Sequence, residues 1–160
     1  MTDLENVYKF LAQRRIALVG LSQKPKHFSR ALFRELIDRK YNVCPVNPNT
    51  DQIDGFPCHR SIADVMQVDY GEFPVGGAII MTSPEKYHEL TEQCIDVGIR
   101  RIWLYGIGGN QKKYADLDEK CRASDVVLIA DLCPFMFLPQ PAFIHRLHGG
   151  ILKIFGKYPK

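Results

Sequence analysis

Five short apolar runs, separated by helix-like segments, constrain the fold of this sequence more than any other feature. Four of the five are almost wholly apolar and do not alternate with polar residues, which is typical of parallel strands covered on both faces. The runs occupy residues 16–19, 42–46, 78–81, 102–105 and 126–130. The helix-like segments occupy residues 3–14, 27–39, 61–66, 84–97 and 110–123. This order predicts an α/β fold, a single doubly wound, mostly parallel five-stranded sheet with helices on both faces.

The chain has the organisation of one domain. Its 160 residues are an ordinary size for a domain that folds without a disulfide or a metal. No linker, low-complexity segment or short repeat interrupts it. We therefore expect a single domain over residues 1–160, with a core over 15–135 and an aromatic, basic tail over 136–160. The tail is expected to pack on the sheet, and an interface with a second copy or a protein partner is the alternative.

Composition excludes several classes of function. The net charge is +3, which is too weak to indicate nucleic-acid binding. No apolar run is long enough for a membrane span, and the first residues lack the basic and apolar regions of a signal peptide. The five cysteines are odd in number, with no CxxC pair and no zinc-ligand spacing. Free thiols, no metal site and a cytoplasmic location are therefore expected.

The residues that follow each strand are the ones expected to meet a ligand, because open parallel sheets bind ligands beyond the carboxyl ends of their strands. After the first strand, Gly20 begins a loop that leads to a helix N-terminus. Backbone N–H groups and the positive end of a helix dipole favour a phosphate there. Ser22 and Ser29 add hydroxyl donors, and Lys24 and Arg30 add positive charge. The pattern predicts a phosphate-binding loop.

The same region disfavours two common nucleotides. The dinucleotide fingerprint G-x-G-x-x-G is absent, because Gly20 is alone and Pro25 interrupts the loop. The acidic residue that would hold a ribose hydroxyl after the second strand is also missing, and Asn47 and Pro48 stand there. No Walker motif occurs. NAD and ATP are therefore disfavoured, and an NAD(P)-binding, oxidoreductase-like domain with a degenerate loop is kept as an alternative.

Two stretches carry a resemblance to a known family. Residues 16–25 (IALVGLSQKP) and 41–48 (YNVCPVNP) resemble the CoA-binding domain family, and residues 53–64, 98–104 and 133–134 add further matches. Its small stand-alone bacterial and archaeal members share a Rossmann-like fold with the CoA-binding domain of the succinyl-CoA synthetase α subunit. The resemblance covers about residues 15–135 and implies CoA lying across the strand ends.

The resemblance also implies which residues form the site. The CoA diphosphate would lie on loop 20–25, the adenosine would border the end of the second strand, and residues after the third and fourth strands would line the rest of the cleft. The expected binding residues are Gly20, Leu21, Ser22, Lys24, Pro25, Ser29, Arg30, Asn47, Pro48, Ser83, Pro84, Leu104, Tyr105 and Gly106.

The sequence departs from the family pattern at three strand ends. Relatives often have lysine where Asn49 stands, glutamine where Tyr105 stands, and Asn-Arg-Cys where Asp131, Leu132 and Cys133 stand. The changes at the second and fifth strand ends remove a lysine and an arginine that could meet the 3′-phosphate of CoA, and Asp131 adds a negative charge. A ligand without that phosphate is therefore a second possibility beside CoA. Cys133 is interpreted as a structural thiol, because the sequence shows no cation or helix N-terminus to activate it.

We therefore expect a cytoplasmic protein that binds coenzyme A or an acyl-CoA as a sensor, carrier or non-catalytic subunit. No catalytic residue is identified, and the partner expected is a small-molecule nucleotide ligand. Two alternatives stay open: the NAD(P)-binding domain described above, and a protein-interaction module with a vestigial pocket whose tail makes the contacts.

Overall fold

A computed structural model describes residues 4–71, 73–105 and 114–138. Its main sheet has five parallel strands in the order β2-β1-β5-β6-β7. Their bounds are β1 (Arg15–Val19), β2 (Asn42–Val46), β5 (Gly77–Ile80), β6 (Arg101–Leu104) and β7 (Val127–Ala130). The five predicted strands are thus confirmed, each within a residue or so of its expected limits.

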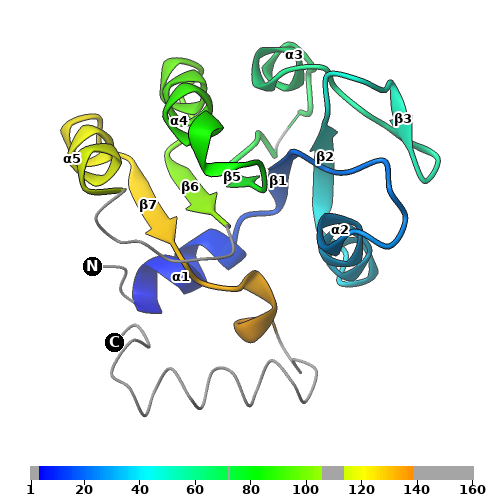
Figure 1. Ribbon diagram of the computed structural model, residues 1–160, viewed down its shortest axis with the longest axis horizontal. Helices are drawn as coiled ribbons and strands as arrows, with labels where there is room; N and C mark the ends of the chain where they lie inside the picture. The colour runs from blue at the N-terminus through cyan, green and yellow to red at the C-terminus, as the bar shows by residue number, and fades with distance from the viewer. Residues whose placement is uncertain (1–3, 72, 106–113, 139–160) are drawn as a thin grey trace.

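Helices cover both faces of this sheet (Figure 1). On one face lie α1 (Leu4–Leu11) and α2 (Phe28–Asp38), and the 3₁₀ turn η3 (Pro134–Met136) joins them there. The other face carries α3 (Ile62–Met66), α4 (Tyr87–Asp96) and α5 (Ala115–Ala123). This arrangement confirms the predicted doubly wound α/β fold.

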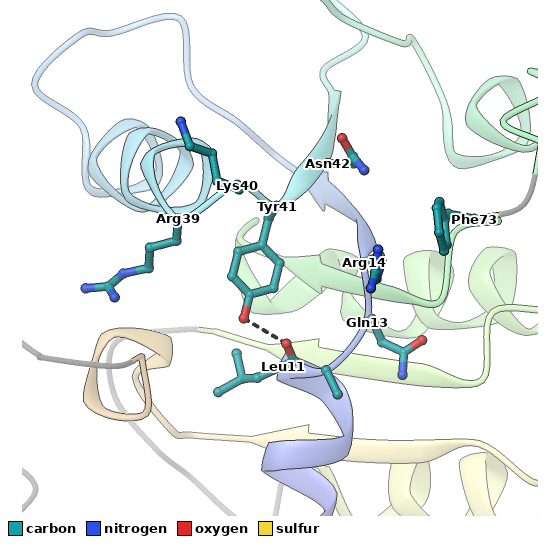
Figure 2. A pocket seen from close by; sticks show the side chains of 9 residues that line it. Leu11, Gln13, Arg14, Arg39, Lys40, Tyr41, Asn42 and Phe73 are labelled. Carbon is teal, nitrogen blue, oxygen red and sulfur yellow. Dashed lines mark hydrogen bonds between the residues drawn. The ribbon is translucent and has the colours of Figure 1, made fainter.

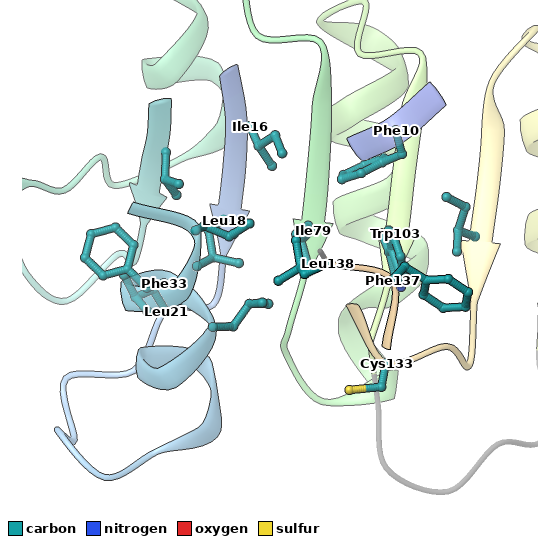
Figure 3. Close-up of a cluster of buried hydrophobic side chains, with 14 of the residues drawn as sticks. Phe10, Ile16, Leu18, Leu21, Phe33, Ile79, Trp103, Cys133, Phe137 and Leu138 are labelled. Atoms are coloured by element: carbon teal, nitrogen blue, oxygen red, sulfur yellow. The ribbon is translucent and has the colours of Figure 1, made fainter. Parts of the chain in front are cut away.

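Each layer has its own apolar core, because successive strand residues point to opposite faces. Figure 3 shows the core beneath α1 and α2, where Phe10, Leu18, Phe33 and Ile79 pack together. At its centre the fully buried Trp103 meets Phe10 edge-to-face, with ring centroids 5.3 Å apart. The Trp103 indole N–H donates to the Leu132 carbonyl over 2.9 Å. The segment after β7 is thereby fixed to the sheet.

The structure differs from expectation in two places. The segment between β2 and α3, where the sequence predicted no strand, contains a small antiparallel hairpin of β3 (Gln52–Ile53) and β4 (Phe56–Pro57). Its turn residues Asp54 and Gly55 both have positive φ, as a tight hairpin turn requires. The helix expected from Pro84 is divided into the 3₁₀ turn η1 (Pro84–Lys86) and α4.

The predictions for the tail concern residues that are mostly outside the described part. Of that segment, Met136, Phe137 and Leu138 are described, and all three are buried against the α1–α2 face of the sheet. The packing expected of the tail as a whole stays a prediction. The interface alternative concerns residues 139–160, which lie outside the described residues.

Candidate functional site

The strand order places a switch point between β1 and β5, because the chain leaves β1 toward β2 on one side and returns to the other side at β5. Ligands of open α/β sheets bind beyond the carboxyl ends of the strands at such a point. Here these ends carry Gly20, after β1, and Met81 and Thr82, after β5. We call this side of the sheet the carboxyl edge.

Gly20 lies so close to the neighbouring strand end that no side chain fits. Its φ is +87°, and a Cβ atom there would lie 2.7 Å from Cγ2 of Thr82 and 3.0 Å from the carbonyl oxygen of Met81. Both the left-handed backbone and the contact require glycine. The loop that follows β1 therefore begins directly against the end of β5.

Loop 20–25 is held by hydrogen bonds to its own Ser22 and to Ser29 at the start of α2. The Ser22 backbone N–H donates to Oγ of Ser29 over 3.0 Å, and the Lys24 N–H donates to Oγ of Ser22 over 3.1 Å. His27 caps α2, since its Nδ1 accepts from the Ser29 N–H. Ser29 is fully buried beneath the loop, whereas Lys24 is exposed at the surface of the loop.

Arg30 has a different place from the one expected of a phosphate-binding cation. Its side chain is only 5% exposed, and its Nη1 donates to the carbonyls of Ser22 and Gln23 over 3.2 and 3.1 Å. Its Nη2 forms an ion pair with Asp54 of the hairpin turn. The hydrogen bond from Arg30 lowers the pKa of the Asp54 carboxyl below its usual value. Arg30 thus fastens loop 20–25 to the hairpin.

The end of β2 holds the loop from a third side. Nδ2 of Asn47 donates to the Leu21 carbonyl over 2.8 Å, while Oδ1 of Asn47 accepts from the Asn49 N–H over 2.8 Å. Nε2 of Gln23 donates to the Asn49 carbonyl over 3.0 Å. Pro48 is exposed beside this junction. Asn47 therefore orders the loop, and its expected contact with the adenosine of CoA stays a prediction.

The remaining expected residues lie along the same edge. Ser83 is exposed and precedes Pro84, and its side chain makes no capping hydrogen bond. Leu104 is buried at the end of β6, and Tyr105 follows it. Gly106 lies outside the described residues. The described candidates of the list thus gather at the carboxyl edge, while Leu21 and Ser29 are buried within it.

An aromatic group closes this edge beside α2. The rings of Phe28 and Tyr105 are stacked, with centroids 4.7 Å apart, and Phe135 meets Phe28 edge-to-face. Burial raises the pKa of Tyr105 to about 12, and the adjacent Cys133 acts in the same direction. Burial also raises the pKa of the Cys133 thiol above its usual value. A raised thiol pKa is the property of a structural cysteine, because nucleophilic cysteines have lowered ones.

Asp131 is a further polar residue at this edge, outside the expected binding residues. Asp131 follows β7 with a φ of +58°, and its Oδ2 is buried without a hydrogen-bond partner. Burial raises the pKa of the Asp131 carboxyl, while a hydrogen bond from Tyr114 acts in the opposite direction. The Tyr87 hydroxyl is also buried without a partner. The sequence indicated Asp131 only as a departure from the family pattern after the fifth strand.

Two negative findings concern the described residues alone. Among residues 4–71, 73–105 and 114–138, no three His, Cys, Asp or Glu side chains are grouped as metal ligands. None of the helices in these ranges has the length and apolar character needed to cross a bilayer. The five cysteines are all buried free thiols.

Comparison with known proteins identifies the family. The model of the family described as CoA binding domain matches residues 14–139. Uncharacterized protein YneT from Bacillus subtilis is 27% identical over 120 residues, which cover 75% of this chain and 82% of YneT. The ADP-forming acetate–CoA ligase of Methanocaldococcus jannaschii is 23% identical over 109 residues. That match covers 68% of this chain and 15% of the ligase, so the chain spans only a small part of the ligase's length.

Solved structures agree with this fold. A hypothetical protein from Pyrococcus horikoshii OT3 superposes with a TM-score of 0.67 at 23% identity, covering 84% of this chain and 87% of that one. The dinucleotide-forming acetyl-coenzyme A synthetase 1 of Ca. Korarchaeum cryptofilum, solved with phosphate and ADP, gives a TM-score of 0.64 at 22% identity. The superposed region covers 77% of this chain and 27% of the synthetase. The Rossmann-like fold and the resemblance found in the sequence are confirmed: the chain belongs to the CoA binding domain family.

Proposed function

We propose that this protein binds coenzyme A or an acyl-CoA at the carboxyl edge, with the diphosphate against loop 20–25. The observation that carries the proposal is the ordered loop itself, which begins at Gly20 on the switch point and leads into the N-terminus of α2. Lys24 is exposed on this loop, so its ammonium group is available to a phosphate. Family membership supports CoA as the ligand.

The proposed site uses the expected residues in two ways. Ser22, Lys24, Pro48 and Ser83 would contact the ligand, because they are exposed or half-buried along the edge. The buried members Leu21, Ser29 and Arg30, with Asn47, would hold the backbone of the loop in place. This division refines the sequence prediction for Arg30, whose guanidinium already has an anionic partner.

We further propose a non-catalytic role as a sensor, carrier or subunit in the cytoplasm. The raised pKa of Cys133 supports the absence of a cysteine nucleophile at this edge. The five free thiols support a reducing compartment. The aromatic group of Phe28, Tyr105 and Phe135 offers an apolar surface on which the pantetheine or acyl end could pack.

The test is a thermal-shift titration of ligand-stripped protein with CoA, acetyl-CoA, dephospho-CoA, NAD, NADP and ATP. A ligand at 100 times its Kd adds about 2.7 kcal/mol to the free energy of unfolding. For a chain of this size that raises the Tm by about 5 to 10 °C. Shifts with CoA and not with NAD, NADP or ATP are expected. A response to NAD(P) alone, or to none of the six, would reject the proposal.

Two comparisons within the experiment sharpen it. Equal shifts with CoA and dephospho-CoA would show that the 3′-phosphate is not recognised, which Asn49 in place of a lysine leads us to expect. Lys24→Ala should weaken CoA binding about tenfold, because a hydrogen bond to a charged group contributes about 1.5 kcal/mol or more. Lys9→Ala on α1, which removes an exposed lysine away from the carboxyl edge, is the matched control and should leave the affinity unchanged.

A further inference from the structure

The opposite side of the sheet, where the strands begin, carries two adjoining hollows that the proposed CoA site does not use. The first has a volume of about 530 Å³ and is lined by residues 11–14, residues 39–42 and Phe73. The second, of about 520 Å³, shares residues 40–42 with it and extends along β2 to Phe56 and Tyr70. We call the two together the amino-edge groove, and Figure 2 shows the first of them.

The charge of this groove is of one sign among the described residues that line it. Four of them are basic, namely Arg14, Arg15, Arg39 and Lys40, and none is Asp or Glu. Arg39 has a carboxylate partner, Glu35, at 2.6 Å. Arg15 is held structurally, because it lies over the Tyr70 ring and donates to the Tyr70 and Phe73 carbonyls. The groove as a whole therefore favours a negatively charged occupant.

Arg14 and Lys40 are the two cations that the fold leaves available. Arg14 is exposed and lies over the Phe73 ring at 4.8 Å, with no carboxylate partner in the described part of the chain. Lys40 is exposed, has no such partner there either, and directly follows the Arg39 C-cap of α2 with a φ of +67°. Glycine is the usual residue at that left-handed position. The chain thus keeps a lysine there at a conformational cost.

The arrangement of the cations suits an extended occupant better than a single small anion. Figure 2 shows Arg39 and Lys40 on one side of the Tyr41 ring, and Arg14 with Phe73 on the other. Their charged ends point apart, so one phosphate or carboxylate could not contact all of them. Aromatic residues, Tyr41, Phe56 and Phe73, lie partly exposed between and beside these cations. Arginine with tyrosine and phenylalanine is the composition of protein-binding surfaces.

We propose that the amino-edge groove docks an extended acidic segment of a partner protein, with Arg14 and Lys40 contacting its carboxylates and apolar side chains packing on Tyr41 and Phe73. Charge complementarity selects an acidic segment, and two adjoining hollows that share residues 40–42 select an extended one. Because the groove lies at the end of the strands opposite to the Gly20 loop, ligand and partner could be bound together.

The test starts from a displayed library of random twelve-residue peptides selected on the full-length protein. Enrichment of peptides rich in Asp and Glu with interspersed apolar residues is expected. A labelled enriched peptide is then measured by fluorescence anisotropy against Arg14→Glu, Lys40→Glu, and Arg122→Glu as a matched charge reversal on the exposed face of α5. The first two should weaken binding at least tenfold, and the third less than twofold. Binding should also weaken with salt, because ions screen exposed charges.

Lys40→Gly separates binding from stability. Glycine suits the positive φ at this position, so the variant should unfold at an equal or higher temperature while its peptide affinity falls at least threefold. All four variants should still show the thermal shift with CoA, which would show that the groove and the carboxyl edge are separate sites. Three results would each overturn the proposal. The selected peptides could lack acidic residues, Arg122→Glu could weaken peptide binding as much as the other charge reversals, or millimolar citrate or phosphate could displace the peptide fully. The last result would indicate a small-anion site.

Discussion

Replacing Gly20 by alanine tests the close approach that begins the proposed binding loop. The left-handed φ of +87° costs an L-residue about 1–2 kcal/mol. The added Cβ would also lie 2.7 Å from Thr82 and 3.0 Å from the Met81 carbonyl, and such overpacking costs about 1–3 kcal/mol. The two effects together predict a loss of about 2–5 kcal/mol in the free energy of unfolding, or roughly 5 to 15 °C in Tm.

Gly98→Ala is the matched control for this prediction. Gly98 has nearly the same φ, +86°, but nothing lies within 4 Å of a Cβ placed there. It should therefore show only the backbone cost, and the difference between the two variants in urea denaturation measures the contact with β5. Gly20→Ala should also lose CoA affinity, because the loop must move, whereas Gly98→Ala should keep it. Equal destabilisation of both variants would refute the argument from close approach.

Three further predictions concern the rest of the fold. Because Asp54 has a lowered pKa in the folded state, its ion pair with Arg30 contributes stability above the ordinary carboxyl pKa and loses it as pH falls through the folded value. Asp54→Asn should therefore flatten the acid side of a stability–pH profile measured by urea denaturation, and an unchanged profile would contradict this role. Trp103→Ala should cost about 3–5 kcal/mol in the same assay, and a loss below about 1 kcal/mol would contradict its central place in the core. All five cysteines are buried, so iodoacetamide should leave the native protein unmodified for minutes at pH 7.5, as followed by mass spectrometry. Rapid alkylation of Cys133 would contradict its structural role.

The sheet was predictable from the sequence because its strands are short, apolar on both sides and separated by amphipathic helices. The run at 78–81, for example, is wholly apolar, and the strand β5 that it forms is buried along its whole length. The β3–β4 hairpin was missed because two-residue strands leave no periodic pattern. Its one local signal was the Asp54–Gly55 pair, which is typical of a tight turn.

The positions of the candidate site residues could be predicted from the sequence better than their roles could. Residues directly after the strands gather at one edge whenever the strands are parallel, so loop 20–25, Asn47 and Ser83 could be placed together. The role of Arg30 could not be foreseen, because its partner Asp54 lies on a hairpin that was not expected. A charge beside a helix N-terminus looks the same in sequence whether it meets a phosphate or a carboxylate of the chain.

The three-sided support of loop 20–25 has a consequence for ligand recognition. Arg30 from α2, Asp54 from the hairpin and Asn47 from β2 hold the loop before any ligand arrives. When a phosphate binds there, ordering of the loop backbone would therefore cost little binding free energy. Sequence changes in the hairpin, which need not touch the ligand, would then alter affinity through the dissociation rate. In the proposed site, the hairpin would therefore influence how long a ligand stays bound without contacting that ligand.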